Sequence, residues 1–186
     1  MYTHSRHLLS TATAVISLVA LPVVARAQAS LQPINITEPA LKADKLDREA
    51  EEYELTDMSK WRVAARLRQE AASLRAADDP KGPLSLYWAA RDQYYTGDER
   101  GGRVLMVQSA ERALSIGDVV HAATAYTEAA YIASELRDMR GAREYATKAR
   151  LLALSPMLTD AQREQIRKNL AIESFSTGLI ASLERR

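Results

Sequence analysis

The sequence resembles itself at a regular interval of about 40 residues, and this interval constrains the fold more than any single residue does. Gly101-Gly102-Arg103 returns as Gly141-Ala142-Arg143, and Ala113-Leu114-Ser115 returns as Ala153-Leu154-Ser155. A period of about 20–50 residues is typical of stacked structural repeats. Such repeats usually present a surface to a partner rather than a reaction centre. A weaker first copy fits the same spacing, with Leu46, Ala50 and Leu74 placed one interval before Leu86, Ala90 and Leu114.

The local patterns from residue 40 onward are helical. Apolar residues recur three and four positions apart, as one face of an α-helix requires, and no segment alternates with the period of two that marks a strand. Gly, Pro and capping residues separate the helical stretches. We therefore predict an all-α fold of seven helices. The first three are expected at about Ala40–Leu55, from a cap at Thr56 or Asp57 to a stop at Asp78-Asp79-Pro80, and from a first turn with Pro83 to Tyr94-Tyr95. The last four are expected from Asp98 to Gly117, from Asp118 through Leu136, from near Gly141 to Ser155-Pro156, and from a capping box of Thr159 and Gln162 onward.

The first 27 residues are predicted to be a signal peptide. A short polar start with Arg6 precedes a mostly apolar run from Leu8 to Val24, and Ala25-Arg26-Ala27 is a small-x-small cleavage site. A membrane anchor is the alternative, but the run is shorter than the ~20 residues that a helical span needs. We expect cleavage after Ala27, a mature protein without an integral membrane span, and a periplasmic or secreted location.

The composition of the mature chain excludes several classes of function. Removing Arg6 and Arg26 from the 25 basic residues leaves 23 against 24 acidic residues, a formal charge of −1, so we expect no nucleic-acid partner. The chain has no cysteine, which excludes disulfides, thiol nucleophiles and thiolate metal sites. We predict no metal site and no cofactor. We interpret the basic run of the second helix as a solvated helix face, because acidic residues interrupt it: Arg62, Arg66, Arg68 and Arg75.

The third repeat unit resembles a tetratricopeptide repeat. That family places a large residue followed by small ones on the first helix of a hairpin and small or aromatic residues on the second. The matching residues here are Tyr126, Ala129, Ala130 and Ala133, then Ala142, Ala146 and Ala149. The second unit matches less closely, the first departs further, and the period of about 40 exceeds the family's usual ~34. The resemblance covers roughly residues 40–156.

The resemblance implies an architecture and a binding surface. It predicts about three helical hairpins (40–156) stacked as a short right-handed α-solenoid, after a tether (28–39) and before a C-terminal capping helix (157–186). It also implies a groove lined by the first helix of each hairpin. In the first unit the groove positions are acidic: Asp44, Asp47, Glu51 and Glu54. The predicted peptide- or protein-binding residues of the other two units are Tyr87, Arg91, Tyr94, Tyr95, Thr127, Tyr131 and Glu135.

Two structural alternatives stay open at this point. An ordinary helical bundle also favours alanine, which is a good helix former, although a bundle does not require the repeated register. The tyrosines of the groove could instead cover neighbouring hairpins, since buried aromatic rings contribute strongly to protein cores.

The sequence favours binding over catalysis. His121 is the one histidine of the mature chain and has no Ser or Cys partner in a recognisable motif, so an enzyme with Glu135 and His121 in a cleft is disfavoured. We predict no catalytic residues. The leading hypothesis is an exported scaffold that binds a peptide or protein of the cell envelope in a Tyr-lined groove, with a basic segment suited to the acidic end. The alternative is a structural or homo-oligomeric subunit that docks through its C-terminal helix onto an envelope complex.

Overall fold

The computed structural model describes the backbone of residues 37–177 and the side chains of residues 37–170. These residues fall in one compact unit, Ile36–Arg186, and the described part contains helices and no strand, as predicted. The predicted signal peptide (1–27) and the predicted tether up to residue 36 lie outside the described residues. The elements are α2 (Glu38–Thr56), the short 3₁₀ helix η1 (Met58–Lys60), α3 (Trp61–Leu74), α4 (Lys81–Tyr95), α5 (Glu99–Ser115), α6 (Val119–Glu135), α7 (Met139–Leu152) and α8 (Asp160–Thr177).

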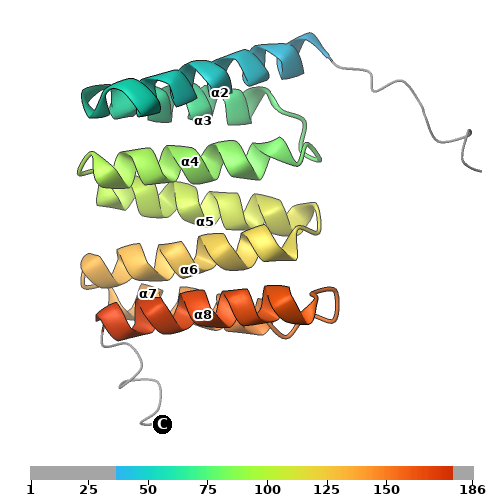
Figure 1. Cartoon of the computed structure of the whole chain (residues 1–186), viewed down its shortest axis with the longest axis vertical. Helices are drawn as coiled ribbons and strands as arrows, with labels where there is room; N and C mark the ends of the chain where they lie inside the picture. Colours follow the sequence, from blue (N-terminus) through green and yellow to red (C-terminus); the bar gives the residue numbers. More distant parts are fainter. Residues whose placement is uncertain (1–36, 178–186) are drawn as a thin grey trace, which may run out of the picture. The chain divides into compact units, whose positions relative to one another are not determined.

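The helices pack mainly on their neighbours in the chain. Contacts join α2 to α3, α3 to α4, α4 to α5, α5 to α6 and α6 to α7, and α8 packs on both α6 and α7. Figure 1 shows these helices one after another, from α2 at the top of the view to α8 at the bottom. A sequence with short turns between amphipathic helices folds in this way because consecutive helices can bury their apolar faces on each other at little cost in loop closure.

Three successive turns repeat one geometry at evenly spaced positions. Gly97 and Gly117 have φ of 87° and 78°, and Arg137 takes the same left-handed conformation with φ of 60°. In each turn the N–H of the following aspartate reaches the carbonyl five residues before it: Asp98 to Gln93, Asp118 to Ala113, and Asp138 to Ala133. This pattern is the Schellman ending of a helix, which satisfies carbonyls that have no partner within the helix.

Each of these aspartates also starts the next helix. The carboxylates of Asp98, Asp118 and Asp138 accept from the backbone N–H of Gly101, His121 and Gly141. The sequence predicted the caps at 98 and 118, and the cap at Asp138 sets the start of α7 at Met139, two residues before the predicted Gly141. The reciprocal hydrogen bonds between Thr159 and Gln162 confirm the predicted capping box of α8.

The second predicted helix differs at its start. Asp57 caps the short η1 through the N–H of Ser59, and α3 begins only at Trp61. The Trp61 indole N–H donates to the carbonyl of Glu54 at 3.1 Å, which anchors this turn to the end of α2. The predicted start of α4 is confirmed, since Pro83 lies in its first turn.

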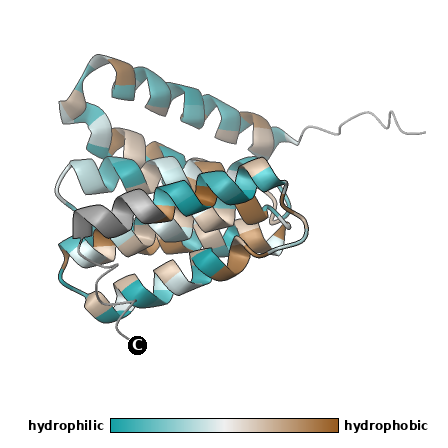
Figure 2. Cartoon of the chain, turned by 60° about the horizontal axis from the view of Figure 1, so that its bottom comes forward, coloured by the Kyte–Doolittle hydropathy of each residue, from teal (hydrophilic) through white to brown (hydrophobic). Residues whose placement is uncertain are grey.

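The core between the helices is built largely from alanine. Figure 2 shows that α2 is mostly hydrophilic, so the apolar residues of the core come mainly from the other helices. Tyr126, Ala130, Ala146 and Ala149 are all buried, as the repeat pattern predicts. At Gly102 an added Cβ would lie 2.8 Å from the carbonyl oxygen of Ala90, so this glycine lets α4 and α5 approach closely. The glycines at 101 and 141 have another cause, because each lies against the carboxylate of its capping aspartate.

Candidate functional site

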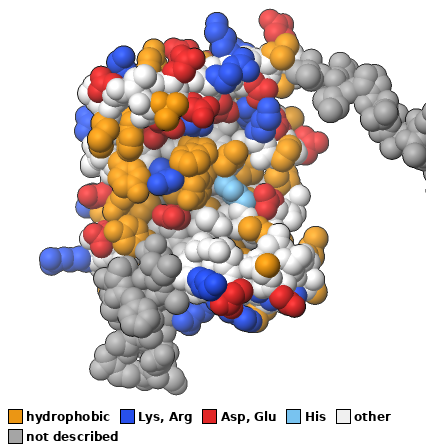
Figure 3. Space-filling model, viewed as in Figure 1, with side chains coloured by type: hydrophobic (Ala, Val, Ile, Leu, Met, Phe, Trp, Pro, Cys, Tyr) orange, Lys and Arg blue, Asp and Glu red, His pale blue; other side chains and the backbone are white. Residues whose placement is uncertain are grey.

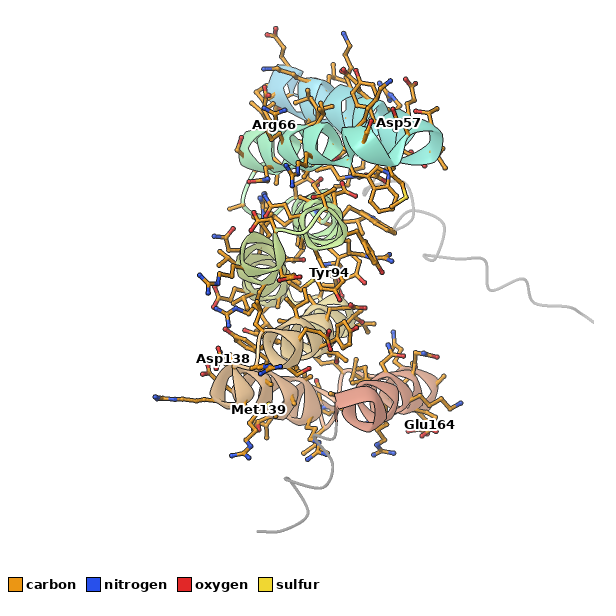
Figure 4. All side chains as sticks on the ribbon, turned by 90° about the vertical axis from the view of Figure 1, so that its left-hand side faces the viewer. Asp57, Arg66, Tyr94, Asp138, Met139 and Glu164 are labelled. Atoms are coloured by element: carbon orange, nitrogen blue, oxygen red, sulfur yellow. The ribbon has the colours of Figure 1, made fainter. Side chains whose placement is uncertain are left out.

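An array of aromatic rings reaches solvent along α4 and the helices beside it. The rings of Tyr94 and Tyr131 lie 6.1 Å apart, those of Tyr94 and Tyr95 5.2 Å apart, and those of Trp61 and Tyr95 5.8 Å apart. Hydrophobic side chains gather over α4 in Figure 3, and Figure 4 places Tyr94 between α4 and α6. None of these rings is fully buried, and Tyr95 is 52% exposed. We call this array the aromatic surface; its residues are Trp61, Tyr87, Trp88, Arg91, Tyr94, Tyr95 and Tyr131.

Arg91 is the cation of the aromatic surface. Its guanidinium lies 5.0 Å from the centre of the Trp88 ring and 5.6 Å from that of Tyr95, and it donates to the Tyr95 hydroxyl at 3.5 Å. Stacking on two rings holds the guanidinium in place, so it loses little freedom when a partner binds. No residue of the described part forms an ion pair with Arg91.

The two tyrosines that contact α6 are fixed by hydrogen bonds. The Tyr94 hydroxyl donates to the Tyr131 hydroxyl at 3.4 Å, and the Tyr87 hydroxyl donates to Glu128 at 3.4 Å. Burial and the Glu128 carboxylate raise the pKa of Tyr87 to about 12, and burial raises the pKa of Tyr94 as well. Both hydroxyls are therefore protonated at neutral pH and act as neutral hydrogen-bonding groups.

The structure brings five of the seven predicted binding residues together in the aromatic surface, and the other two, Thr127 and Glu135, lie outside it. Thr127 is 3% exposed, and its hydroxyl donates to the carbonyl of Ala123 inside α6, so its side chain is not available to a partner. Glu135 is exposed at the last turn of α6. Sequence reasoning placed neither Trp61 nor Trp88 in the site. Trp88 lies three residues before Arg91, one turn of helix away, and that spacing is the signal that could have identified it.

A cavity of about 460 Å³ lies beside the aromatic surface, between α2 and α4. Figure 3 shows charged side chains of both signs gathered near α2. Arg75 donates to Asp44 and Asp47 at 2.7 Å each and to Asp79 at 3.1 Å, and Lys81 donates to Asp44. The cavity is lined by Asp44, Asp47, Arg48, Glu51, Glu54 and Leu55 of α2, by Arg68 and the adjoining Arg75, and by Lys81, Leu84, Ser85 and Trp88 of α4.

These ion pairs correct two sequence interpretations. Arg68 and Arg75 are buried, and Arg68 holds the Glu54 carboxylate with two nitrogens, so they are not part of a solvated face. The carboxylates of Asp44, Asp47 and Glu54 are already neutralised within the chain, and the acidic end no longer favours a basic segment. The sequence contains one sign of this pairing. Asp47 and Glu54 are seven residues apart, as are Arg68 and Arg75, so each pair lies on one face of its helix.

A buried carboxyl group connects the cavity to the aromatic surface. Asp92 of α4 is 3% exposed and lies near Glu54, Arg68 and Arg91. Burial and the neighbouring Glu54 carboxylate raise the pKa of Asp92 to about 8. At neutral pH Asp92 is therefore mainly protonated and uncharged. The Arg68 guanidinium then pairs mainly with the Glu54 carboxylate, which it binds through two nitrogens.

The structure supplies His121 with the serine partner that the sequence did not reveal. The Ser109 hydroxyl donates to the carbonyl of Pro83 at 2.7 Å, and the Nε2 atom of His121 lies 2.8 Å from the same oxygen. Since the one hydroxyl proton goes to Pro83, the serine oxygen accepts from His121. Ser109 is fully buried and burial lowers the pKa of His121, so this pair joins α4, α5 and α6 rather than forming an accessible nucleophile.

Neither a protein-family model nor a curated protein sequence matches this chain. Within the described residues no group of His, Asp and Glu side chains is arranged to hold a metal ion. No helix between residues 37 and 177 is long and apolar enough to cross a membrane.

Proposed function

We propose that this protein is an exported scaffold of tetratricopeptide-like hairpins that binds a protein or peptide segment through the aromatic surface. In this proposal α2–α3, α4–α5 and α6–α7 are three hairpins of a short right-handed solenoid, and α8 is its cap. Two observations support it. Packing follows chain order, and the turns at Gly97, Gly117 and Arg137 are evenly spaced, so that two successive helices and their turns make up one period of the sequence.

The observation that carries the binding function is the stack of Trp88, Arg91 and Tyr95. Aromatic and arginine side chains that reach solvent are those that most often dominate the energy of protein interfaces. Here they are held by mutual contacts, and Arg91 has no ion pair within the described residues. The aromatic surface therefore offers a partner an ordered apolar area with one available cation. Binding would cost little free energy for ordering these side chains.

Export belongs to the same proposal. The signal-peptide pattern in the first 27 residues supports it, and the partner is then a protein of the envelope or the exterior. Mass spectrometry of the protein purified from the periplasm or medium tests this directly. The expected mass is that of residues 28–186, and an intact chain in the membrane fraction would contradict it.

The binding test compares variants that differ only at the aromatic surface. Purified wild-type protein and the Arg91→Ala and Tyr95→Ala variants are incubated with detergent-solubilised envelope proteins, and the proteins retained by each are compared by mass spectrometry. We expect at least one protein retained by the wild type to be lost from both variants. Val104→Ala is the matched control, since Val104 is 50% exposed on α5 and does not belong to the aromatic surface. Calorimetry with the retained protein should give an affinity at least about tenfold lower for each variant, and equal affinity would reject the proposed surface.

A second candidate function rests on another group of exposed apolar residues. Leu151, Leu154 and Met157, at and beyond the end of α7, are 62%, 68% and 75% exposed. We propose as the alternative that this end of the protein docks onto a second copy or an envelope complex, as the C-terminal helix was expected to do. Sedimentation of the wild type and of a Leu151→Ser, Leu154→Ser variant tests docking onto a second copy, because only an oligomer would lose mass in the variant. The envelope proteins retained by the same variant test docking onto a complex.

A further inference from the structure

The cavity between α2 and α4 has the size and position of a small-molecule site. Its volume of about 460 Å³ falls within the range of about 300–1,000 Å³ that is usual for ligand pockets. It lies next to the aromatic surface but has its own lining, in which only Trp88 is common to both. What could occupy it follows from which of its charges are already paired.

Most of the charges in the cavity neutralise one another. Asp44, Asp47 and Glu54 are engaged by the cations of α3 and α4 and of the turn between them. Arg48 and Glu51 are different, because neither forms an ion pair with any residue of the described part. Both are exposed and line the cavity from α2. An occupant therefore meets one available cation and one available anion.

The spacing of these two residues matters for the choice of ligand. Residues three apart in a helix have Cβ atoms about 5–6 Å from each other, so the two charged groups reach the same ligand. A purely cationic or purely anionic ligand would gain one favourable contact and meet one like charge. A ligand that carries both charges close together gains two favourable contacts, one with Arg48 and one with Glu51. The charge pattern therefore favours a zwitterion.

Two further lining residues, Leu55 and Leu84, are apolar and accessible. Leu55 is 81% exposed and Leu84 is 45% exposed, although side chains of this kind are usually covered in a folded protein. Together with Trp88 they supply the apolar part of the cavity lining. A ligand with an apolar side chain would cover this part of the lining and gain the corresponding burial free energy.

We infer that the cavity binds a zwitterionic amino acid or short unblocked peptide that carries an apolar side chain. The ligand's ammonium group is received by Glu51, its carboxylate by Arg48, and its side chain by Leu55, Leu84 and Trp88. This site is separate from the proposed binding of a protein segment, and either can hold without the other.

The test uses L-leucine and leucyl-leucine as probes, with N-acetyl-leucinamide as the control that keeps the side chain but has no charge. Binding to the full mature protein is measured by ligand-observed NMR and calorimetry. We expect leucine or leucyl-leucine to bind and the capped compound to bind at least about tenfold more weakly. If only the peptide binds, the ligand is a peptide; if both bind, the site recognises the zwitterionic head group. Equal binding of the capped compound, or binding of none of the three, would overturn the inference.

Variants assign the binding to the cavity. Arg48→Gln and Glu51→Gln should each weaken binding about tenfold, and Arg48→Lys should retain most of it because the charge is kept. Arg66→Gln and Glu52→Gln are the matched controls, since both residues are exposed and neither lines the cavity. Unchanged affinity in the two cavity variants would overturn the assignment. The Tyr95→Ala variant should bind the probes normally, which separates this site from the aromatic surface.

Discussion

Tyr94 of α4 and Tyr131 of α6 meet edge to face, with ring planes at 69° and hydroxyl oxygens 3.4 Å apart. Both side chains are half-buried, so they join α4 to α6 and remain partly accessible to solvent. Of the two interpretations that the sequence left open, the packing role applies to this pair, and the role in binding a partner stays a prediction.

The contact between the two rings should be measurable as a coupling energy. Replacing Tyr94 and Tyr131 with Ala, singly and together, should give urea unfolding free energies that depart from additivity by about 0.5–1.5 kcal/mol, the usual worth of an aromatic pair. Tyr94→Ala combined with Tyr53→Ala is the control, because no contact joins Tyr53 to Tyr94 among the described residues. Additive effects in both cycles would show that the Tyr94–Tyr131 contact contributes no stability.

Arg137 occupies a position that favours glycine. Its φ of 60° matches the left-handed residue of the two preceding turns, where glycine stands, and a non-glycine residue in this conformation costs roughly 1–2 kcal/mol. Arg137→Gly should therefore stabilise the protein by up to about 1 kcal/mol, after the greater flexibility of glycine in the unfolded chain is allowed for. The measurement is the urea midpoint.

The converse substitution serves as the control for this turn. Gly117 has φ of 78° and no atom within 4 Å of an added Cβ, so Gly117→Ala changes the backbone preference without a clash. It should destabilise the protein by about 1 kcal/mol. If Arg137→Gly lowered the midpoint, the left-handed turn would not be the source of strain proposed here.

The helices and their ends were accessible to sequence reasoning because they depend on local chemistry. The caps at Asp98 and Asp118 and the capping box at Thr159 each involve residues within three positions of one another. Glycine after a helix signals its end for the same reason. Arg137 breaks that signal, since the chain keeps the turn geometry with a residue that disfavours it. The cap that follows at Asp138 was missed.

The candidate sites were less accessible because they depend on contacts between distant segments. The tyrosines of α4 and α6 could be placed on one surface by the resemblance to a repeat family. Nothing local indicates that Arg75 pairs with Asp44, 31 residues away. The basic run of α3 and the acidic run of α2 each resemble a solvated face when taken alone. The matching seven-residue spacings of Asp47 with Glu54 and of Arg68 with Arg75 permit pairing, and the packing of α2 on α3 shows that it occurs.

The buried alanines of α6 and α7 should not tolerate a charged side chain. Ala130 is 5% exposed within the core cluster, so Ala130→Glu would place an unpaired carboxylate and extra volume in a close helix contact. We expect destabilisation by several kcal/mol, roughly the sum of overpacking and desolvation. Ala161→Glu, at an exposed position in the first turn of α8, should leave the thermal midpoint nearly unchanged. A midpoint for Ala130→Glu equal to that of the wild type would reject the packing of α6.

The buried Asp92 should make stability fall as the pH rises. Its folded-state pKa of about 8 lies above the value of about 3.9 expected in the unfolded chain. Between these values the folded protein holds a proton that the unfolded chain releases, so the free energy of unfolding decreases from about pH 4 to about pH 8 and is level outside that window. His121 acts in the opposite sense below about pH 6.5, because its pKa is lowered on folding.

Comparison of the wild type with Asp92→Asn isolates the contribution of this carboxyl group, since His121 is present in both proteins. The difference in unfolding free energy between the two, measured in urea at each pH, should grow in favour of the variant up to about pH 8. Asp78→Asn, at an exposed position, should show no such trend. A difference that stays constant from pH 4 to pH 8 would mean that Asp92 ionises normally and that Glu54 and burial do not hold its proton.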